Sequence, residues 1–450
     1  MHDLMVLTTV CAFLLTIGFI FWRPSVNEAI PASIGAAFVL LSGSVSLADL
    51  GSILETISGA AITIIATIVM AIVLESFGFF YWAADLLAKK ANGSGVRLFW
   101  LTNLFCFLMT LFVNNDGSIL ITTPILLMLL KNMGLKPHQK IPYLISGAII
   151  ATASSAPIGV SNIVNLIALK IVHMSLYMHT AMMFVPASLG LCVLAGMLYA
   201  IFYKSLPKQI PKHGFMPGSH PLKEADGDNG NNGNSGNNRN RTRFMRNVLI
   251  FVLCVRVSLF AASYAGIPVS LMAVIGSAAL LVWRWLYLKV TPMDMVKKTP
   301  WNILVFAFGM YVIIYGLNNI GLTDYLIRLL QPIVTSSLLN ASVLMGALLS
   351  VLSNLFNNHP ALMVGTLTLT HMDLDPLTLK ISYLASVIGS DIGSLMLPIG
   401  TLATLMWMHI VNKGGVKISW MQYLRVTIVA IPVTAVFTLV VLAYWVKWLF

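Results

Sequence analysis

Long apolar runs bounded by short polar segments fill most of the 450-residue chain. The hydrocarbon core of a bilayer takes about 20 helical residues, so such runs predict membrane-spanning helices. The uninterrupted runs cover 5–22, 27–43, 57–80, 180–203, 247–265, 268–288, 300–320 and 423–446. Four more runs, 96–133, 141–172, 337–370 and 377–411, contain polar residues near their middle. The pattern predicts an all-α polytopic membrane protein.

Two of the interrupted runs carry an asparagine pair at their centre. The pair is Asn114-Asn115 in 96–133 and Asn357-Asn358 in 337–370. Asp116 follows the first pair, and an ionisable residue at bilayer depth costs about 3 kcal/mol or more, so it is rare there unless it is functional. Each run is too long for one simple span. We therefore predict two re-entrant hairpins whose polar tips lie inside the membrane.

The other two interrupted runs combine proline, glycine and small polar residues at their midpoints. The sequences there are SSAPIGVSN in 141–172 and GSDIGSLMLPIG in 377–411. Proline removes a helix hydrogen bond, and glycine tolerates unwound backbone. Unwound backbone at membrane depth is tolerated only inside protein or beside a polar cavity. We predict two broken helices whose free backbone groups meet the hairpin tips at a ligand site.

Hairpin and broken-helix motifs recur in the same order in both halves of the chain. The first asparagine precedes the proline of the broken helix by 43 residues in one half and by 41 in the other. Such a repeat predicts a duplicated transporter fold. The N-terminal repeat spans 1–203, with scaffold spans in 5–80 and a closing span at 180–203. The C-terminal repeat spans 247–450, with scaffold spans in 247–320 and a closing span at 423–446.

The segment 204–246 between the repeats is rich in glycine, asparagine and charge, which predicts a disordered linker. With two re-entrant hairpins, most of the 27 basic residues fall on the linker side of the membrane. The positive-inside rule makes that side cytoplasmic and puts the N-terminus outside. The two repeats are then inverted relative to each other. The net charge of +12 is explained by topology and contact with the lipid bilayer, without nucleic acid.

Composition and motifs exclude several protein classes. Hydrophobic residues make up 58% of the chain and charged residues only 9%, against about 25% charged in average proteins. The four cysteines stand alone in apolar segments, so no disulfide framework or thiolate metal site is expected. The chain has no phosphate-binding GxxxxGK[ST] loop, no GxSxG and no HExxH. We expect a transporter rather than an enzyme, with neither cofactor nor metal.

The predicted site offers amides, hydroxyls and helix ends but no lysine or arginine. A dicarboxylate or phosphate carrier needs a cation there, so the composition of the site favours a neutral or cationic substrate. The candidate substrate-binding residues are Asn114, Asn115, Ser155, Ser161, Asn162, Asn357, Asn358, Ser390 and Thr401.

Two carboxylates are candidates for carrying protons: Asp116, the sole ionisable group at its tip, is the leading one, and Asp391 in the second broken helix is the next. Burial disfavours the charged form, so either group could hold a proton near neutral pH. Either could instead cap the N-terminus of a half-helix. Arg256 lies within a predicted span and needs a partner, for which Glu75 and Asp391 are the candidates; Glu75 could instead reach the headgroups.

Four segments of the chain resemble signature segments of the arsenical pump membrane protein family, the arsenite/antimonite permeases of the ion transporter superfamily. They are FVNNDGSILITTPI, SSAPIGVSNIVNLI, NNHPALMVGTL and GSDIGSLMLPIGTLATLMWMH. The resemblance covers the chain outside the linker. At the second tip this chain has His359 where the family leads us to expect an apolar residue.

The resemblance implies that the chain exports trivalent arsenic and antimony from the cell through the plasma membrane. Export would proceed by exchange with protons or with an arsenite-stimulated ATPase as partner. Relatives in the superfamily also imply a homodimer whose hairpin domains move against a scaffold. The alternative is a sodium/proton antiporter of the same superfamily, with Asp116 and Asp391 as ion ligands.

Overall fold

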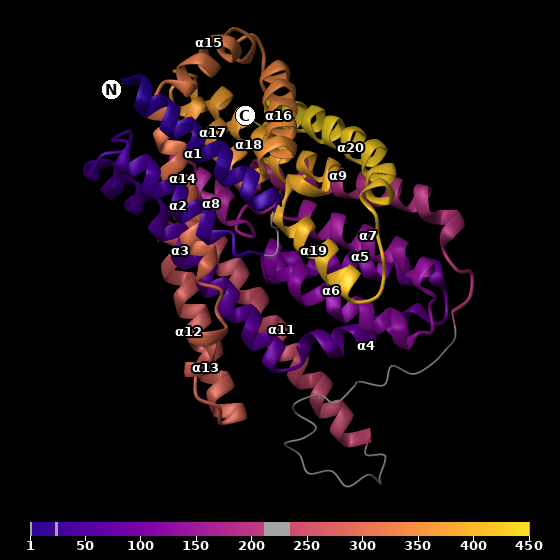
Figure 1. Ribbon diagram of the computed structural model, residues 1–450. Coiled ribbons are helices and arrows are strands. Elements are labelled where there is room, and N and C mark those ends of the chain that lie inside the picture. The colour runs from indigo at the N-terminus through magenta and orange to yellow at the C-terminus, as the bar shows by residue number, and fades with distance from the viewer. Residues whose placement is uncertain (1, 23–25, 211–234, 450) are drawn as a thin grey trace.

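Helices dominate the computed structural model of the protein, which describes residues 2–22, 26–210 and 235–449 (Figure 1). The side chains of residues 116, 235–239 and 296 lie outside this description. Within the described ranges, nine helices are long and apolar enough to cross a membrane. No strand occurs in them. The prediction of an all-α polytopic membrane protein is confirmed.

The same order of helices recurs in the two halves of the chain. The first half consists of α1 (His2–Trp22), α2 (Ala29–Leu41), α3 (Leu47–Ser76), α4 (Phe79–Ala91), α5 (Gly95–Phe112), α6 (Asn115–Asn132), α7 (Pro137–Ala153), α8 (Ile163–Ile171), α9 (Leu176–Phe202) and the 3₁₀ turn η1 (Tyr203–Ser205). The second half consists of α11 (Ser235–Tyr264), α12 (Val269–Leu288), α13 (Met293–Lys298), α14 (Asn302–Asn319), α15 (Leu322–Val334), α16 (Leu338–Phe356), α17 (Asn358–Thr370), α18 (Pro376–Asp391), the 3₁₀ turns η2 (Gly393–Met396) and η3 (Pro398–Gly400), α19 (Leu402–Lys413) and α20 (Trp420–Leu449).

Two helix boundaries differ by ten residues or more from the sequence-based prediction. Helix α3 begins ten residues before the predicted span, because the Ser46 hydroxyl accepts the Asp49 N–H and the Asp49 carboxylate accepts the Ser46 N–H. Helix α11 begins at Ser235, inside the predicted linker. The start of that linker is also ordered, since the Ile210 N–H donates to the Gly93 carbonyl at 2.8 Å. The remaining linker residues, 211–234, lie outside the described residues.

Two short helices, α4 and α15, were not predicted. Each has 13 residues, too few to cross a bilayer, so a reading based on span length treated both as loops. Helix α15 is amphipathic: Thr323 and Leu330 are buried, whereas Tyr325, Leu329 and Ile333 are exposed. Figure 1 draws α15 at the upper end of the molecule and α4 near the lower end. Each lies directly before the hairpin of its half.

The two halves pack against each other through pairs of helices, with one helix from each half in every pair. In the scaffold α3 packs against α12 and α2 against α14. The α2–α14 contact is close, because a Cβ at Gly309 would lie 2.8 Å from the Ala32 carbonyl oxygen. The hairpins and broken helices cross in the same way, with α6 against α19 and α8 against α17.

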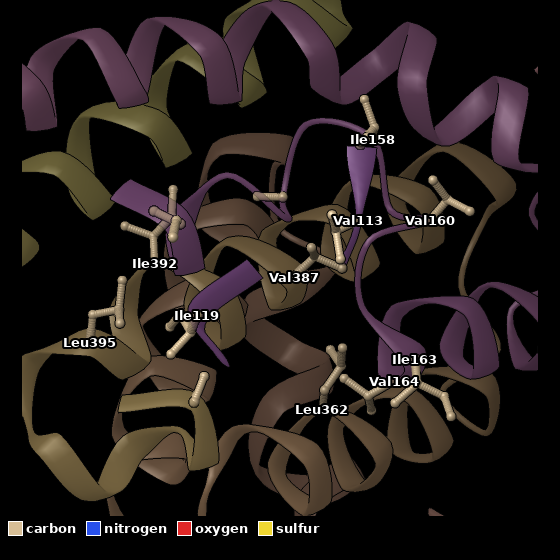
Figure 2. Packing of buried hydrophobic residues seen from close by; sticks show 14 of the residues in the cluster. Val113, Ile119, Ile158, Val160, Ile163, Val164, Leu362, Val387, Ile392 and Leu395 are labelled. Atoms are coloured by element: carbon tan, nitrogen blue, oxygen red, sulfur yellow. The ribbon is translucent and has the colours of Figure 1, made fainter. Parts of the chain in front are cut away.

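Apolar side chains from both halves fill the space around the tips and breaks (Figure 2). The figure shows such residues on the first tip, both breaks and the helices beside them, namely Val113, Ile119, Ile158, Val160, Ile163, Val164, Leu362, Val387, Ile392 and Leu395. All belong to one continuous buried cluster. The polar groups between them are therefore buried, and a buried polar atom without a partner is costly.

Candidate functional site

The two helices of each predicted hairpin meet at its asparagine pair. Helix α6 begins after Asn114, whose side-chain oxygen accepts the Gly117 N–H at 3.0 Å. Helix α17 begins after Asn357, whose side-chain oxygen accepts the His359 N–H at 3.3 Å. The first asparagine of each pair thus caps the returning helix of its hairpin.

Both predicted broken helices lose α-helical structure around their Pro-Ile-Gly motifs, which lie in turns in the first break and in the 3₁₀ turn η3 in the second. The helix resumes at α8 after Asn162, whose side-chain oxygen accepts the Val164 N–H at 3.2 Å. It resumes at α19 after Thr401, whose hydroxyl accepts the Thr404 N–H at 3.0 Å. Four short helices, α6, α8, α17 and α19, therefore start from the tips and breaks. Their N-termini carry partial positive charge and favour hydrogen-bond acceptors or anions.

Asp391, at the end of α18, is held by side chains from the other half of the chain. Its Oδ1 accepts a hydrogen bond from Asn162 Nδ2 at 3.1 Å. Its Oδ2 lies 2.7 Å from Asn165 Nδ2 and 2.8 Å from the Ser155 hydroxyl. The carboxylate is 1% exposed, and no described basic side chain forms an ion pair with it. We call Ser155, Asn162 and Asn165 the Asp391 cradle.

The first hairpin is tied to the first break by a separate set of hydrogen bonds. The Asn115 N–H donates to the Ser161 carbonyl at 2.8 Å. The Ser161 hydroxyl donates to the Thr110 carbonyl at 2.9 Å, and the Thr110 hydroxyl donates to the Ala151 carbonyl at 2.8 Å. These bonds fix the first tip against the segment that supplies the cradle.

The second hairpin is tied to its own break by Asn354, one turn before the tip. Its Nδ2 donates to the Gly393 carbonyl at 2.8 Å, and its Oδ1 accepts the Leu397 N–H at 2.7 Å. The Ser390 hydroxyl donates to the Asn358 carbonyl at 3.5 Å, the weak end of hydrogen bonding.

Several buried polar atoms around this region have no hydrogen-bond partner among the described residues. They come from both tips and both breaks, namely Asn115 Oδ1, Thr152 Oγ1, Asn165 Oδ1, Asn357 Nδ2, Asn358 Oδ1 and Ser394 Oγ. A buried polar atom left unpaired costs about 1–3 kcal/mol, so native proteins usually pair it. A hydrogen-bonding ligand or water at this site would satisfy them.

All nine candidate substrate-binding residues are buried at the tips and breaks, and they have different local roles. Ser155 and Asn162 contact Asp391; Asn114, Asn162, Asn357 and Thr401 cap helices; Ser161 and Ser390 bond to backbone; Asn115 and Asn358 carry unpaired oxygens. Asp116 lies in the first turn of α6, and its side chain is outside the described residues. Within the described residues no group of His, Cys, Asp and Glu could hold a metal ion.

Arg256 has different partners from those that the sequence suggested. It forms no ion pair with Glu75 or Asp391. Instead its guanidinium, 5% exposed, donates from α11 to the carbonyls of Phe112 and Val113, directly before the first tip. A cation at the C-terminus of α5 satisfies carbonyls that the helix leaves free. The expectation of no lysine or arginine at the site is therefore wrong at the first tip.

Sequence reasoning missed four residues of this region: Asn165, Asn354, His179 and Tyr383. Asn165 lies three positions after Asn162, a spacing that places both on one helix face, so this signal was present. Asn354 stands one turn before a tip that was already identified. His179 and Tyr383 carry no such signal, because their contacts depend on how α9 and α18 pack on the first break.

Comparison with known proteins identifies the family. The sequence profile of the arsenical pump membrane protein family matches residues 8–446. A putative arsenical pump membrane protein of Bacillus subtilis is 59% identical, with 98% of this chain and 99% of the relative aligned. An arsenical pump membrane protein of Escherichia coli is 31% identical over 96% of this chain and 97% of the relative.

A solved structure supports the fold independently. The YdaH transporter of Alcanivorax borkumensis superposes with a TM-score of 0.54, covering 90% of each chain at 12% identity. Identity this low carries information on the fold alone. The profile match across nearly the whole chain and the two similar pumps agree with the motifs at the tips and breaks, and they establish that this chain belongs to the arsenical pump membrane protein family.

Proposed function

We propose that the chain exports arsenite and antimonite from the cell in exchange for protons, and that Asp391 carries the proton. The observation that supports this most is the buried Asp391 carboxylate, which joins the two halves through uncharged donors only. A buried carboxylate without an ionic partner is a costly arrangement, and such groups inside membranes usually serve transport.

The chemistry of the substrate fits the unpaired atoms of the site. Arsenous acid is a neutral triol at neutral pH, so it donates and accepts hydrogen bonds like a small polyol. Asn115 and Asn358 offer unpaired oxygens to its hydroxyl protons, and Asn357 offers an unpaired amide nitrogen to its oxygens. The four helix N-termini offer further donors. Hydrogen bonds of this kind can be released again, as a carrier requires.

Proton and substrate compete for one position on Asp391. A carboxylate has about four lone-pair sites. Oδ2 accepts from Asn165 and lies against the Ser155 hydroxyl, whose single proton can also go to the Thr152 carbonyl at 2.7 Å, whereas Oδ1 accepts only from Asn162. The remaining lone pair of Oδ1 can take either a proton or a hydrogen bond from an arsenous hydroxyl, but not both. Binding of one therefore displaces the other, which is what exchange transport needs.

The cycle follows from this competition. Arsenous acid enters from the cytoplasm, and Asp391 accepts a hydrogen bond from it in the charged form. On the outer side a proton binds Oδ1, weakens the contact and releases the substrate. The hairpins must move to open the site, because the tips and breaks are buried in this conformation.

Asp116 is the alternative proton carrier. Its backbone lies in the first turn of α6, next to Asn115, whose side-chain oxygen has no partner among the described residues, and two residues after Asn114. Only the Asp391 side chain has described contacts, so the experiment must include a variant of each carboxylate.

Three further features belong to the proposal. The chain lies in the plasma membrane with its N-terminus outside and 204–246 in the cytoplasm, as the positive-inside rule expects. It forms a homodimer, and it can work with an arsenite-stimulated ATPase. The sodium/proton antiporter alternative gains no support, because the relatives reported above are named for arsenical transport.

Arsenite accumulation in everted membrane vesicles, with and without a proton gradient, tests the proposal. We expect gradient-driven uptake by the native protein and its loss in Asp391→Asn. Asp116→Asn is the matched variant, with the same charge change at the other carboxylate. Uptake lost only in Asp116→Asn would move the proton site to the first tip. Gradient-independent uptake, or sodium-driven proton movement without arsenite uptake, would contradict the proposed exchange.

A further inference from the structure

We propose that His179 is a positioning residue that holds the Asp391 cradle from the closing helix α9. The inference rests on the proposed role of Asp391 and extends it to a residue that touches neither Asp391 nor substrate. His179 is fully buried in the first turn of α9. Two separate contacts connect its ring to the cradle.

The first contact is a hydrogen bond to the backbone of the first break. His179 Nε2 lies 3.0 Å from the carbonyl oxygen of Ala156, which directly follows Ser155. The ring also covers Gly159, whose φ is +61° and whose added Cβ would lie 3.0 Å from Nε2. The imidazole therefore fixes the turn between Ser155 and Asn162 from behind.

The second contact runs through Tyr383 on α18. The rings of His179 and Tyr383 meet edge to face, with centroids 6.0 Å apart. The Tyr383 hydroxyl donates to the Asn165 carbonyl at 3.2 Å. The same histidine thus supports both ends of the cradle, Ser155 through Ala156 and Asn165 through Tyr383.

The hydrogen bond determines the tautomer of His179. A carbonyl only accepts, so Nε2 must carry the proton and donate it to Ala156. Nδ1 is buried and has no partner among the described residues. The arrangement suits a neutral imidazole whose donor is at Nε2.

The closing helix of the other half offers a matched control. Tyr423 is the fourth residue of α20, as His179 is of α9. Its hydroxyl donates to the Leu395 carbonyl in the second break at 3.0 Å. This bond holds a break in the same way but supports none of the cradle residues.

The test is the pH profile of arsenite uptake in vesicles for His179→Gln, His179→Asn and Tyr423→Phe in the full-length protein. The glutamine amide reaches the place of Nε2, whereas the asparagine amide reaches only that of Nδ1. The titratable groups at this contact are Asp391 and Tyr383 on α18. A loosened cradle stabilises the charged carboxylate less, so uptake then needs a higher pH.

We expect His179→Asn to raise the pH of half-maximal uptake by about half a unit or more, and His179→Gln to keep it near the native value. Tyr423→Phe can lower the amount of folded protein without moving the midpoint. A native midpoint in His179→Asn, or an equal shift in Tyr423→Phe, would overturn the inference. If Asp391→Asn itself keeps gradient-driven uptake, the proposed function fails; if it loses uptake while His179→Asn keeps the native midpoint, only the positioning role fails.

Discussion

The two broken helices have the same architecture and opposite chemistry. The first break contributes hydrogen-bond donors from Ser155, Asn162 and Asn165, and the second contributes the acceptor Asp391. Both continue into a short capped helix, α8 in one half and α19 in the other. The same local architecture thus carries different side chains in the two halves, and in the function we propose the polar contact between the halves holds the proton.

The scaffold also contacts the two tips differently. Arg256 on α11 donates to the backbone before the first tip, whereas Phe306 on α14 packs against His359 at the second, with ring centroids 5.6 Å apart. The backbone differs too: Asn357 has φ +77° and ψ 152°, a conformation that favours glycine, whereas Asn114 is extended. The scaffold therefore contacts the first tip through a charged donor and the second through ring packing, and only the second tip has a strained backbone.

The largest expected effect comes from breaking the charged contact at the first tip. Arg256→Met leaves the Phe112 and Val113 carbonyls without this donor, so we expect a loss of about 1–3 kcal/mol in stability. A loss of about 1.4 kcal/mol lowers the ratio of folded to unfolded protein about tenfold. Arsenite uptake per folded molecule should fall as well, because this contact no longer holds the first tip. Arg256→Lys keeps a donor and a charge, so its stability and its arsenite uptake should lie between those of the native protein and those of Arg256→Met. Phe306→Leu at the second tip should lower stability and arsenite uptake less than Arg256→Met does. Equal losses in the two variants would contradict the difference between the tips.

A matched pair of glycine substitutions separates the backbones of the two tips. Asn357→Gly removes a backbone strain that costs about 1 kcal/mol or more. It also removes a helix cap, whose replacement by glycine costs only about a few tenths of a kcal/mol. The net change should therefore stabilise the folded protein. Asn114→Gly loses a cap without relieving strain and should be slightly destabilising. Thermal unfolding of purified protein in one detergent checks the signs. Destabilisation in both variants would mean that Asn357 is not strained.

The smallest effect concerns the start of the two broken helices. Asp375 caps α18 and accepts the N–H groups of Leu377 and Thr378, each at 3.0 Å. Hydrogen bonds from the side chain and backbone of Thr378 lower the pKa of Asp375 below its ordinary value of 3.8. The charged cap therefore stabilises above pH 3.8, and this contribution disappears as the pH falls through the lowered pKa.

Replacing this exposed cap should cost about 0.5 kcal/mol at neutral pH, the low end of the range for helix caps. We expect Asp375→Ala to lower the unfolding temperature at pH 7 and to match the native protein more closely in acid. Gln139→Ala is the counterpart in α7, where the Gln139 amide oxygen accepts the Lys136 N–H at 3.0 Å. That bond does not titrate, so its effect should not change with pH. A pH-independent difference for Asp375→Ala would contradict a charged cap.

Local patterns predicted the parts of the fold but not their pairing. Asn114, Asn357, Pro157 and Pro398 indicated the tips and breaks because asparagine caps helices and proline removes a helix hydrogen bond. Proline alone does not decide, since Pro124 and Pro432 lie inside helices. Helices α4 and α15 were missed, since 13 residues do not match the length of a span.

The site itself depends on contacts between distant residues. Ser155 and Asp391 are 236 positions apart, and only the packing of one half against the other brings them together. Arg256 likewise finds its carbonyls 143 and 144 positions away. Backbone acceptors leave no mark in a sequence, so a search for side-chain partners proposed carboxylates for Arg256 instead.

Proton release on arsenite binding tests the central claim most directly. Purified protein in weakly buffered detergent would be mixed with arsenite at a pH where Asp391 is partly protonated, and proton release would be followed with a pH dye. Competition at Oδ1 predicts release of up to one proton per bound arsenite in the native protein and in His179→Gln, and none in Asp391→Asn. Arsenite binding without proton release in the native protein, or unchanged release in Asp391→Asn, would contradict the exchange at Asp391.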